Sequence, residues 1–79
     1  MNGRILIIDD EEKLRTLLAK IISLEQFEVL QAADCKSALK RLEQGAIDVA
    51  LCDVKLPDGS GVDLVKTIKE KFPAVETIF

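Results

Sequence analysis

Apolar residues occur along this chain in two alternating patterns, short continuous runs and longer stripes with a spacing of three or four residues. Continuous runs are typical of strands covered on both faces, and stripes are typical of amphipathic helices. The runs predict strands at residues 4–8, 27–32, 48–53 and 75–79. The stripes predict helices at about 11–24, between Asp34 and Gly45, and at about 61–72. This alternation predicts an α/β domain with a parallel sheet and right-handed crossovers.

Residues that start and stop helices agree with these boundaries. Asp10 and Asp34 are predicted to cap the first and second helices, because their carboxylates accept hydrogen bonds from free N–H groups. Gly45 stands where a left-handed cap is expected at the end of the second helix, and Pro73 ends the third. The first helix is expected to present one apolar stripe, made of Leu14, Leu17, Leu18, Ile21 and Ile22.

Three aspartates directly follow two of the predicted strands. Asp9 and Asp10 end the first apolar run, and Asp53 ends the third. In open α/β folds the carboxyl ends of the strands form the edge where ligands bind, so neighbouring strands would bring these acids together. Three close carboxylates need a cation, a proton or a phosphoryl group to offset their repulsion. Taken singly, Asp9 and Asp10 are more typical of helix caps, and Asp53 of a turn.

Composition narrows the chemistry of this acidic cluster. The 79 residues allow one modest core, with 48% hydrophobic and 32% charged residues and a net charge of −3. The chain has no histidine, which excludes imidazole metal sites and Ser-His-Asp catalysis. Oxygen ligands alone favour Mg²⁺. Cys52 is expected to be a buried apolar residue, and no disulfide with Cys35 is expected.

The charge pattern and hydropathy also bear on partners and location. The absence of a basic run argues against direct binding of nucleic acid by this segment. No apolar stretch approaches the ~20 residues that a membrane span requires, and the first run is too short for a secretory signal. These features predict a cytoplasmic protein.

The acidic residues belong to segments that resemble a known family. Residues 5–11 (Ile-Leu-Ile-Ile-Asp-Asp-Glu), 49–53 (Val-Ala-Leu-Cys-Asp) and 56–61 (Leu-Pro-Asp-Gly-Ser-Gly) resemble the receiver domain of bacterial two-component response regulators. The spacing from Asp53 to Pro57 and to Gly61 also matches this family. The resemblance covers the whole chain and implies a flavodoxin-like, doubly wound parallel sheet with strand order 2-1-3-4.

The resemblance also implies a role for each matching residue. Asp53 would accept the phosphoryl group. Asp10 would bind Mg²⁺ directly and Asp9 through water, with the backbone carbonyl of Lys55 completing the protein ligands. The Lys55 side chain has two open readings, one pointing into the pocket and one in solvent.

Two further residues and the partners follow from the same resemblance. Pro57 would fix the loop after the acceptor, and Gly61 would let the third helix begin close to it. The phosphodonor would be a sensor histidine kinase, and an output domain outside this chain would control transcription. The sequence of residues 53–61 resembles the corresponding segment in receivers of sigma-54-dependent activators.

The family pattern has five βα units, and residues 1–79 match a partial receiver domain of roughly the first three and a half. The serine or threonine after the fourth strand and the lysine after the fifth are expected to be missing, and Thr77 is not that hydroxyl. We therefore expect impaired phosphotransfer, and self-association through an exposed sheet edge or an uncovered sheet face.

Two alternative functions remain open. One is a receiver-like interaction or assembly module that does not turn over phosphate. The other is an aspartate-nucleophile phosphatase of the haloacid dehalogenase type, although its Asp-x-Asp motif is matched neither by Asp9-Asp10 nor by residues 53–55.

Overall fold

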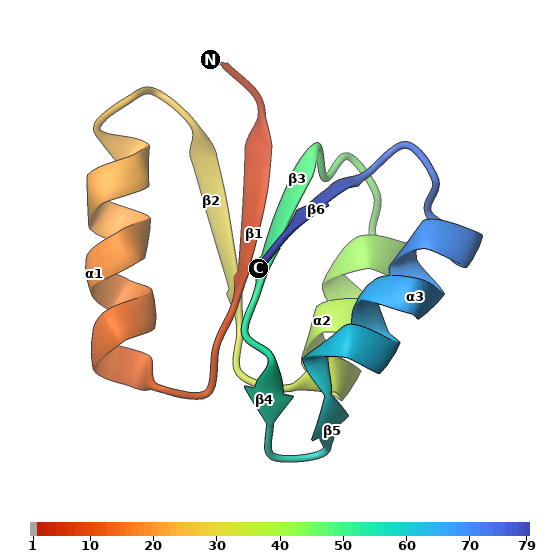
Figure 1. Cartoon of the computed structure of the whole chain (residues 1–79). Coiled ribbons are helices and arrows are strands. Elements are labelled where there is room, and N and C mark those ends of the chain that lie inside the picture. The colour runs from red at the N-terminus through yellow and green to blue at the C-terminus, as the bar shows by residue number, and fades with distance from the viewer. Residues whose placement is uncertain (1) are drawn as a thin grey trace.

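The computed structural model describes residues 2–79 as a four-stranded parallel sheet with helices on both faces and a separate two-stranded hairpin (Figure 1). Its elements, in chain order, are β1 Arg4–Ile8, α1 Glu12–Ser23, β2 Glu28–Ala32, α2 Cys35–Glu43, β3 Val49–Cys52, β4 Lys55–Leu56, β5 Gly59–Ser60, α3 Gly61–Lys71 and β6 Glu76–Ile78. The main sheet has the order β2-β1-β3-β6. The predicted fold class and strand order are therefore confirmed. Among residues 2–79 no helix is long and apolar enough to cross a bilayer.

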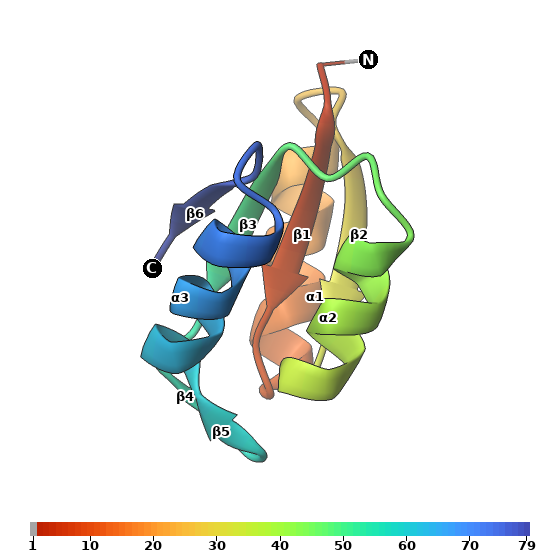
Figure 2. The same ribbon diagram turned by 90° about the vertical axis from the view of Figure 1, so that its right-hand side faces the viewer.

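Strand β1 lies between β2 and β3 and is covered from both sides of the sheet. Helix α1 packs on one face, and α2 and α3 pack on the other, as Figures 1 and 2 show from perpendicular directions. Leu6 and Ile8 point into the core beneath α2 and α3, while Ile5 and Ile7 face α1. This two-sided burial explains why the sequence of β1 is a continuous apolar run.

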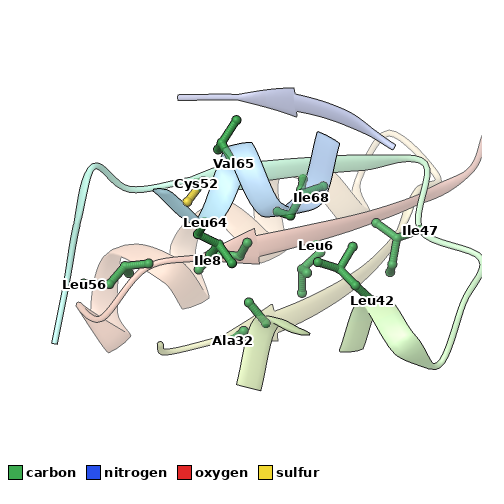
Figure 3. Close-up of a cluster of buried hydrophobic side chains, with 12 residues drawn as sticks. Leu6, Ile8, Ala32, Leu42, Ile47, Cys52, Leu56, Leu64, Val65 and Ile68 are labelled. Atoms are coloured by element: carbon green, nitrogen blue, oxygen red, sulfur yellow. The ribbon is translucent and has the colours of Figure 1, made fainter. Parts of the chain in front are cut away.

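The larger core lies between the sheet and the helices α2 and α3 (Figure 3). Ala38 of α2 and Ile68 of α3 are completely buried there, and the core continues to Leu56 of β4. Cys52 is buried in the same cluster, as predicted, and both cysteines are free thiols. This face of the sheet therefore carries most of the buried apolar surface.

The opposite face is only partly covered by α1. Ala19 is buried and Leu18 and Ile22 are half-buried, but Leu14, Leu17 and Ile21 are 41%, 54% and 52% exposed. The predicted stripe of α1 is therefore split, because the helix turns only one edge of it toward the sheet. Val49 and Leu51 of β3, which face the same side, are also only half-buried.

The helix ends agree with the prediction for α2 and correct it for α1. Asp34 accepts a hydrogen bond from the Ser37 N–H at 2.8 Å and forms a full capping box with that residue. The predicted cap at Asp10 is wrong, because Glu11 occupies the N-cap without a side-chain bond. The Glu11 N–H instead donates to Asp9 Oδ1 at 2.9 Å. Gly45 has φ +86°, the left-handed conformation expected for it.

The resemblance implies a loop after Asp53, and the structure has a short hairpin there. Strands β4 and β5 pair antiparallel, Lys55 with Ser60 and Leu56 with Gly59. Leu56 is buried in the core, which gives this hairpin an apolar anchor that turn propensities alone do not reveal. Ser60 then caps α3 by accepting a hydrogen bond from the Val62 N–H at 3.1 Å.

Two valines on α3 test the asymmetry of packing. Val65 is 6% exposed and Val62 is 42% exposed, so the substitution Val65→Ala removes buried methyl groups and Val62→Ala does not. We expect Val65→Ala to lower the free energy of unfolding by about 2 kcal/mol and Val62→Ala to change it by less than about 0.5 kcal/mol. Urea denaturation followed by circular dichroism measures both; equal losses would contradict the packing described here.

The exposed apolar residues on the α1 side predict self-association. The exposed residues of α1 include Leu17 and Ile21, and Leu24 is exposed at the C-cap of this helix. Near the C-terminus, Ile78 pairs with Leu51 of β3, and both Ile78 and Phe79 are exposed. Apolar patches of this kind favour contacts between copies of a chain. Sedimentation velocity should show a concentration-dependent rise in mass for the wild type and a smaller rise for a Leu17→Lys and Ile21→Lys double variant. A wild type that remains monomeric at high concentration would contradict the prediction.

Candidate functional site

The parallel pairing of β1 with β3 brings the acidic residues together. Ile8 and Cys52 are register partners at the carboxyl ends of these strands, and Asp9 and Asp53 follow them directly. The Asp53 N–H donates to the Ile8 carbonyl at 2.9 Å, and the Asp9 N–H donates to the Ala32 carbonyl at 3.0 Å. The main chain of both aspartates is thus held by the sheet. Their side chains project from its edge as the α/β rule for ligand sites expects.

Asp9, Asp10 and Asp53 form a three-carboxylate cluster. One oxygen from each lies within 4.8 Å of the others, with Asp9 and Asp53 half-buried and Asp10 exposed. Two unit charges about 4 Å apart repel by roughly 1 kcal/mol in water and about 4 kcal/mol at an effective dielectric constant near 20. A cation bound among them removes this cost, and an all-oxygen donor set fits a hard divalent ion.

An arginine on α1 fixes the strand end that carries Asp9. Arg15 donates through Nη1 to the main-chain carbonyl of Asp9 at 2.8 Å and through Nε to Gln31 Oε1 at 2.9 Å. The side chain thereby ties α1 to the loop after β1 and to β2. The sequence pattern does not reveal the role of Arg15, because its partners are the main-chain carbonyl of Asp9 and the side chain of Gln31, which lies on β2.

Gly61 allows α3 to begin directly against Asp53. A Cβ atom placed on Gly61 would collide with the Asp53 carbonyl oxygen, so no other residue fits without movement of the main chain. The Gly61 N–H donates to the Val54 carbonyl at 2.7 Å. This close approach determines the path of the chain as it leaves and returns to Asp53.

The two thiols near the site are poor candidates for ligands or nucleophiles. Burial raises the pKa of both thiols to about 11. Asp58 adds to this effect at Cys35, and Cys35 and Asp53 add to it at Cys52. Both thiols are therefore protonated at neutral pH, whereas metal binding and nucleophilic attack require the thiolate. The chemistry of the cluster rests on the carboxylates.

A cavity of about 330 Å³ adjoins the cluster on the α1 side of the sheet. Asp9 and Asp53 contribute to its lining, and the other lining residues are Ile7, Ile8, Leu18, Leu51, Cys52, Val54 and Phe79. Asp9 and Asp53 therefore lie at the edge of a cavity whose other lining residues are apolar.

Two further residues assigned from sequence lie on the hairpin that follows Asp53. Lys55 begins β4 with an exposed side chain, which agrees with the solvent reading of that side chain. Pro57 is exposed in the turn between β4 and β5. The roles of the Lys55 carbonyl in metal binding and of Pro57 in fixing the loop remain predictions.

Comparison with known proteins identifies the family. A family model described as the response regulator receiver domain matches residues 5–79. The chain belongs to the response regulator receiver domain family. Receiver domains are signalling modules of two-component systems, which accords with the predicted class of function.

Individual relatives agree with this assignment. The chain is 35% identical over 71 residues to the alkaline phosphatase synthesis transcriptional regulatory protein PhoP of Bacillus subtilis, covering 90% of this chain and 30% of PhoP. It is 38% identical over 68 residues to the response regulator protein PilR of Pseudomonas aeruginosa, covering 86% of this chain and 15% of PilR. The chain thus spans less than a third of these curated relatives.

A solved receiver structure shows the same fold. The response regulator TrrA of Thermotoga maritima, crystallised in complex with Mg²⁺-BeF, superposes with a TM-score of 0.89 at 31% identity. The match covers 95% of this chain and 65% of the TrrA chain. This receiver therefore shares its described architecture with part of the TrrA chain.

The close approach at Gly61 gives a prediction for this receiver. Gly61→Ala should shift the main chain at Asp53 and lower the free energy of unfolding by about 1–3 kcal/mol, as overpacking does. Gly59→Ala is the matched control, because its Cβ would meet only Cys35 Sγ at 3.4 Å. Urea denaturation and the amide chemical shift of Asp53 report both effects. A Gly61→Ala variant as stable as the Gly59→Ala control would contradict the geometry.

Proposed function

We propose that this receiver accepts a phosphoryl group on Asp53 with the help of Mg²⁺. The observation that carries the proposal is the meeting of three carboxylates, from the ends of β1 and β3, within 4.8 Å of one another. Asp10 would bind the metal directly, Asp9 through water, and the Lys55 carbonyl would complete the protein ligands. Asp53 would contribute its second carboxylate oxygen to the metal.

In the proposed transfer, one oxygen of Asp53 attacks the phosphorus of the donor. The bond between phosphorus and the donor breaks, its electron pair leaves with the donor, and Asp53 becomes an acyl phosphate. When bound, Mg²⁺ would supply positive charge to the phosphoryl oxygens and to the carboxylates. Asp9 and Asp10 would hold it beside Asp53, whose main chain is fixed by its bond to Ile8.

The residues after Asp53 position the acceptor in this proposal. Gly61 keeps the start of α3 against the Asp53 carbonyl, and Pro57 restricts the turn of the hairpin. The aspartyl phosphate is a signal rather than an intermediate of turnover, so the protein acts as a phospho-acceptor switch that assists its own phosphorylation and not as an enzyme with a separate substrate.

The partners follow from relatives with the same fold. TrrA has been crystallised with the histidine kinase ThkA, and that structure matches this chain with a TM-score of 0.89. PhoP of Bacillus subtilis is a transcriptional regulatory protein. We therefore assign a sensor histidine kinase as phosphodonor and transcriptional output through another domain. Residues 1–79 would correspond to the first three and a half βα units of the receiver.

Beryllofluoride, a mimic of the phosphoryl group, tests the proposal directly. ¹⁹F NMR of the wild type should show bound beryllofluoride only when Mg²⁺ is present, with an affinity lowered in keeping with the impaired phosphotransfer expected from the sequence, and removal of the metal by chelation should release it. Asp53→Asn should abolish the bound signal, because the negatively charged carboxylate is replaced by a neutral amide. Glu70→Gln removes one exposed acid from α3 and should bind as the wild type does.

Two results would decide against phosphoryl acceptance. A folded wild type that does not bind beryllofluoride with Mg²⁺ would favour the alternative function, an interaction or assembly module without phosphotransfer. Binding that survives in the Asp53→Asn variant would show that the acceptor has been misassigned.

A further inference from the structure

The carboxylate of Asp58 joins the hairpin β4–β5 to the start of α2. Asp58 Oδ1 accepts a hydrogen bond from the Cys35 N–H at 2.8 Å, and Oδ2 accepts one from the Lys36 N–H at 3.1 Å. Both donors are among the free N–H groups of the first turn of α2, where a negative charge is also favoured by the helix dipole. These two hydrogen bonds hold the pKa of Asp58 below its ordinary value.

This contact is additional to the helix's own cap. The next N–H of α2, that of Ser37, is already bound by Asp34 in a capping box. Asp34 precedes the helix directly, whereas Asp58 reaches it from 22 and 23 residues further along the chain. Asp58 therefore fixes the position of the hairpin relative to α2, which a local cap does not do.

The hairpin β4–β5 follows the proposed acceptor, Asp53, along the chain. It leaves Asp53 through Lys55 and returns to it at Gly61, and it lies at the same end of the molecule as the start of α2 (Figures 1 and 2). Leu56 anchors it in the core. The turn at its tip is exposed at Pro57 and Gly59, and the Asp58 carboxylate ties this turn to a helix.

We propose that Asp58 is a positioning residue for the site, holding the hairpin through α2 so that the Lys55 carbonyl and Asp53 keep the geometry that Mg²⁺ and the phosphoryl group require. The inference rests on the proposed function and deepens it. Asp58 does not contact the metal in this scheme. It acts on the affinity for Mg²⁺ in the way that residues outside the direct ligands orient those ligands.

Two alanine variants separate positioning from helix stability. Asp58→Ala removes the link between hairpin and helix, and Asp34→Ala removes a cap from the same helix end without touching the hairpin. ¹⁵N NMR titration with Mg²⁺, repeated with beryllofluoride, measures affinity in each. We expect Asp58→Ala to weaken Mg²⁺ binding by about tenfold, and Asp34→Ala to leave it close to that of the wild type.

Two further readouts are specific to positioning. Mg²⁺ should shift the amide resonances of Cys35 and Lys36 in the wild type, because the hairpin transmits the change to them, and the shift should be lost in Asp58→Ala. Asp58→Asn keeps one acceptor oxygen, so its affinity should lie between those of the wild type and Asp58→Ala. If Asp58→Ala does not fold, the Mg²⁺ affinity of Asp58→Asn is compared with those of the wild type and Asp34→Ala instead.

The possible failures are distinguishable. A wild type that binds neither Mg²⁺ nor beryllofluoride overturns the proposed function itself. A wild type that binds them, with Asp58→Ala and Asp58→Asn binding equally well, overturns the positioning role and leaves Asp58 as a cap of α2. Equal weakening in Asp58→Ala and Asp34→Ala also overturns it, because the stability of α2 would then be the cause.

Discussion

The pairing of β1 with β3 is the constraint on which the rest of this structure depends. These strands are far apart in sequence, yet the parallel register places Ile8 beside Cys52 and so places Asp9 beside Asp53. In this register Leu6 pairs with Ala50 and Ile8 with Cys52, and these four side chains pack in the same core beneath α2 and α3. The apolar packing of the sheet therefore fixes the distance between charged groups at its edge. Stability and function are coupled through this one contact.

The two halves of the site are held in different ways. Asp9 and Asp53 are fixed by main-chain bonds to neighbouring strands, and Arg15 braces the loop after β1. The hairpin after Asp53 instead depends on the burial of Leu56, on the close approach of Gly61 and on Asp58. The segment directly after Asp53, the proposed acceptor, is therefore held by contacts with the core and with α2.

Local patterns in the sequence predicted most of the fold and the acidic cluster, because strand burial, the Asp34 cap and the Gly45 turn each depend on nearby residues. Where a prediction failed, the local pattern did not contain the deciding contact. Asp10 does not cap α1, since the helix begins one residue later, at Glu12, with Glu11 at its N-cap. The hairpin at 55–60 and the bonds of Asp58 depend on the core and on α2, which no periodicity in the segment reveals.

The ends of β1 and β3 are proposed to form one shared cation site, and binding of paramagnetic Mn²⁺ tests this most directly. Substoichiometric Mn²⁺ broadens the amide resonances of residues close to it, and Mg²⁺ should compete with it for the same ligands. We predict that broadening is centred on Asp9, Asp10 and Asp53, extends to Lys55, and is reversed by Mg²⁺. Broadening that is centred on other acidic residues, or spread over the surface without reversal by Mg²⁺, would contradict the claim.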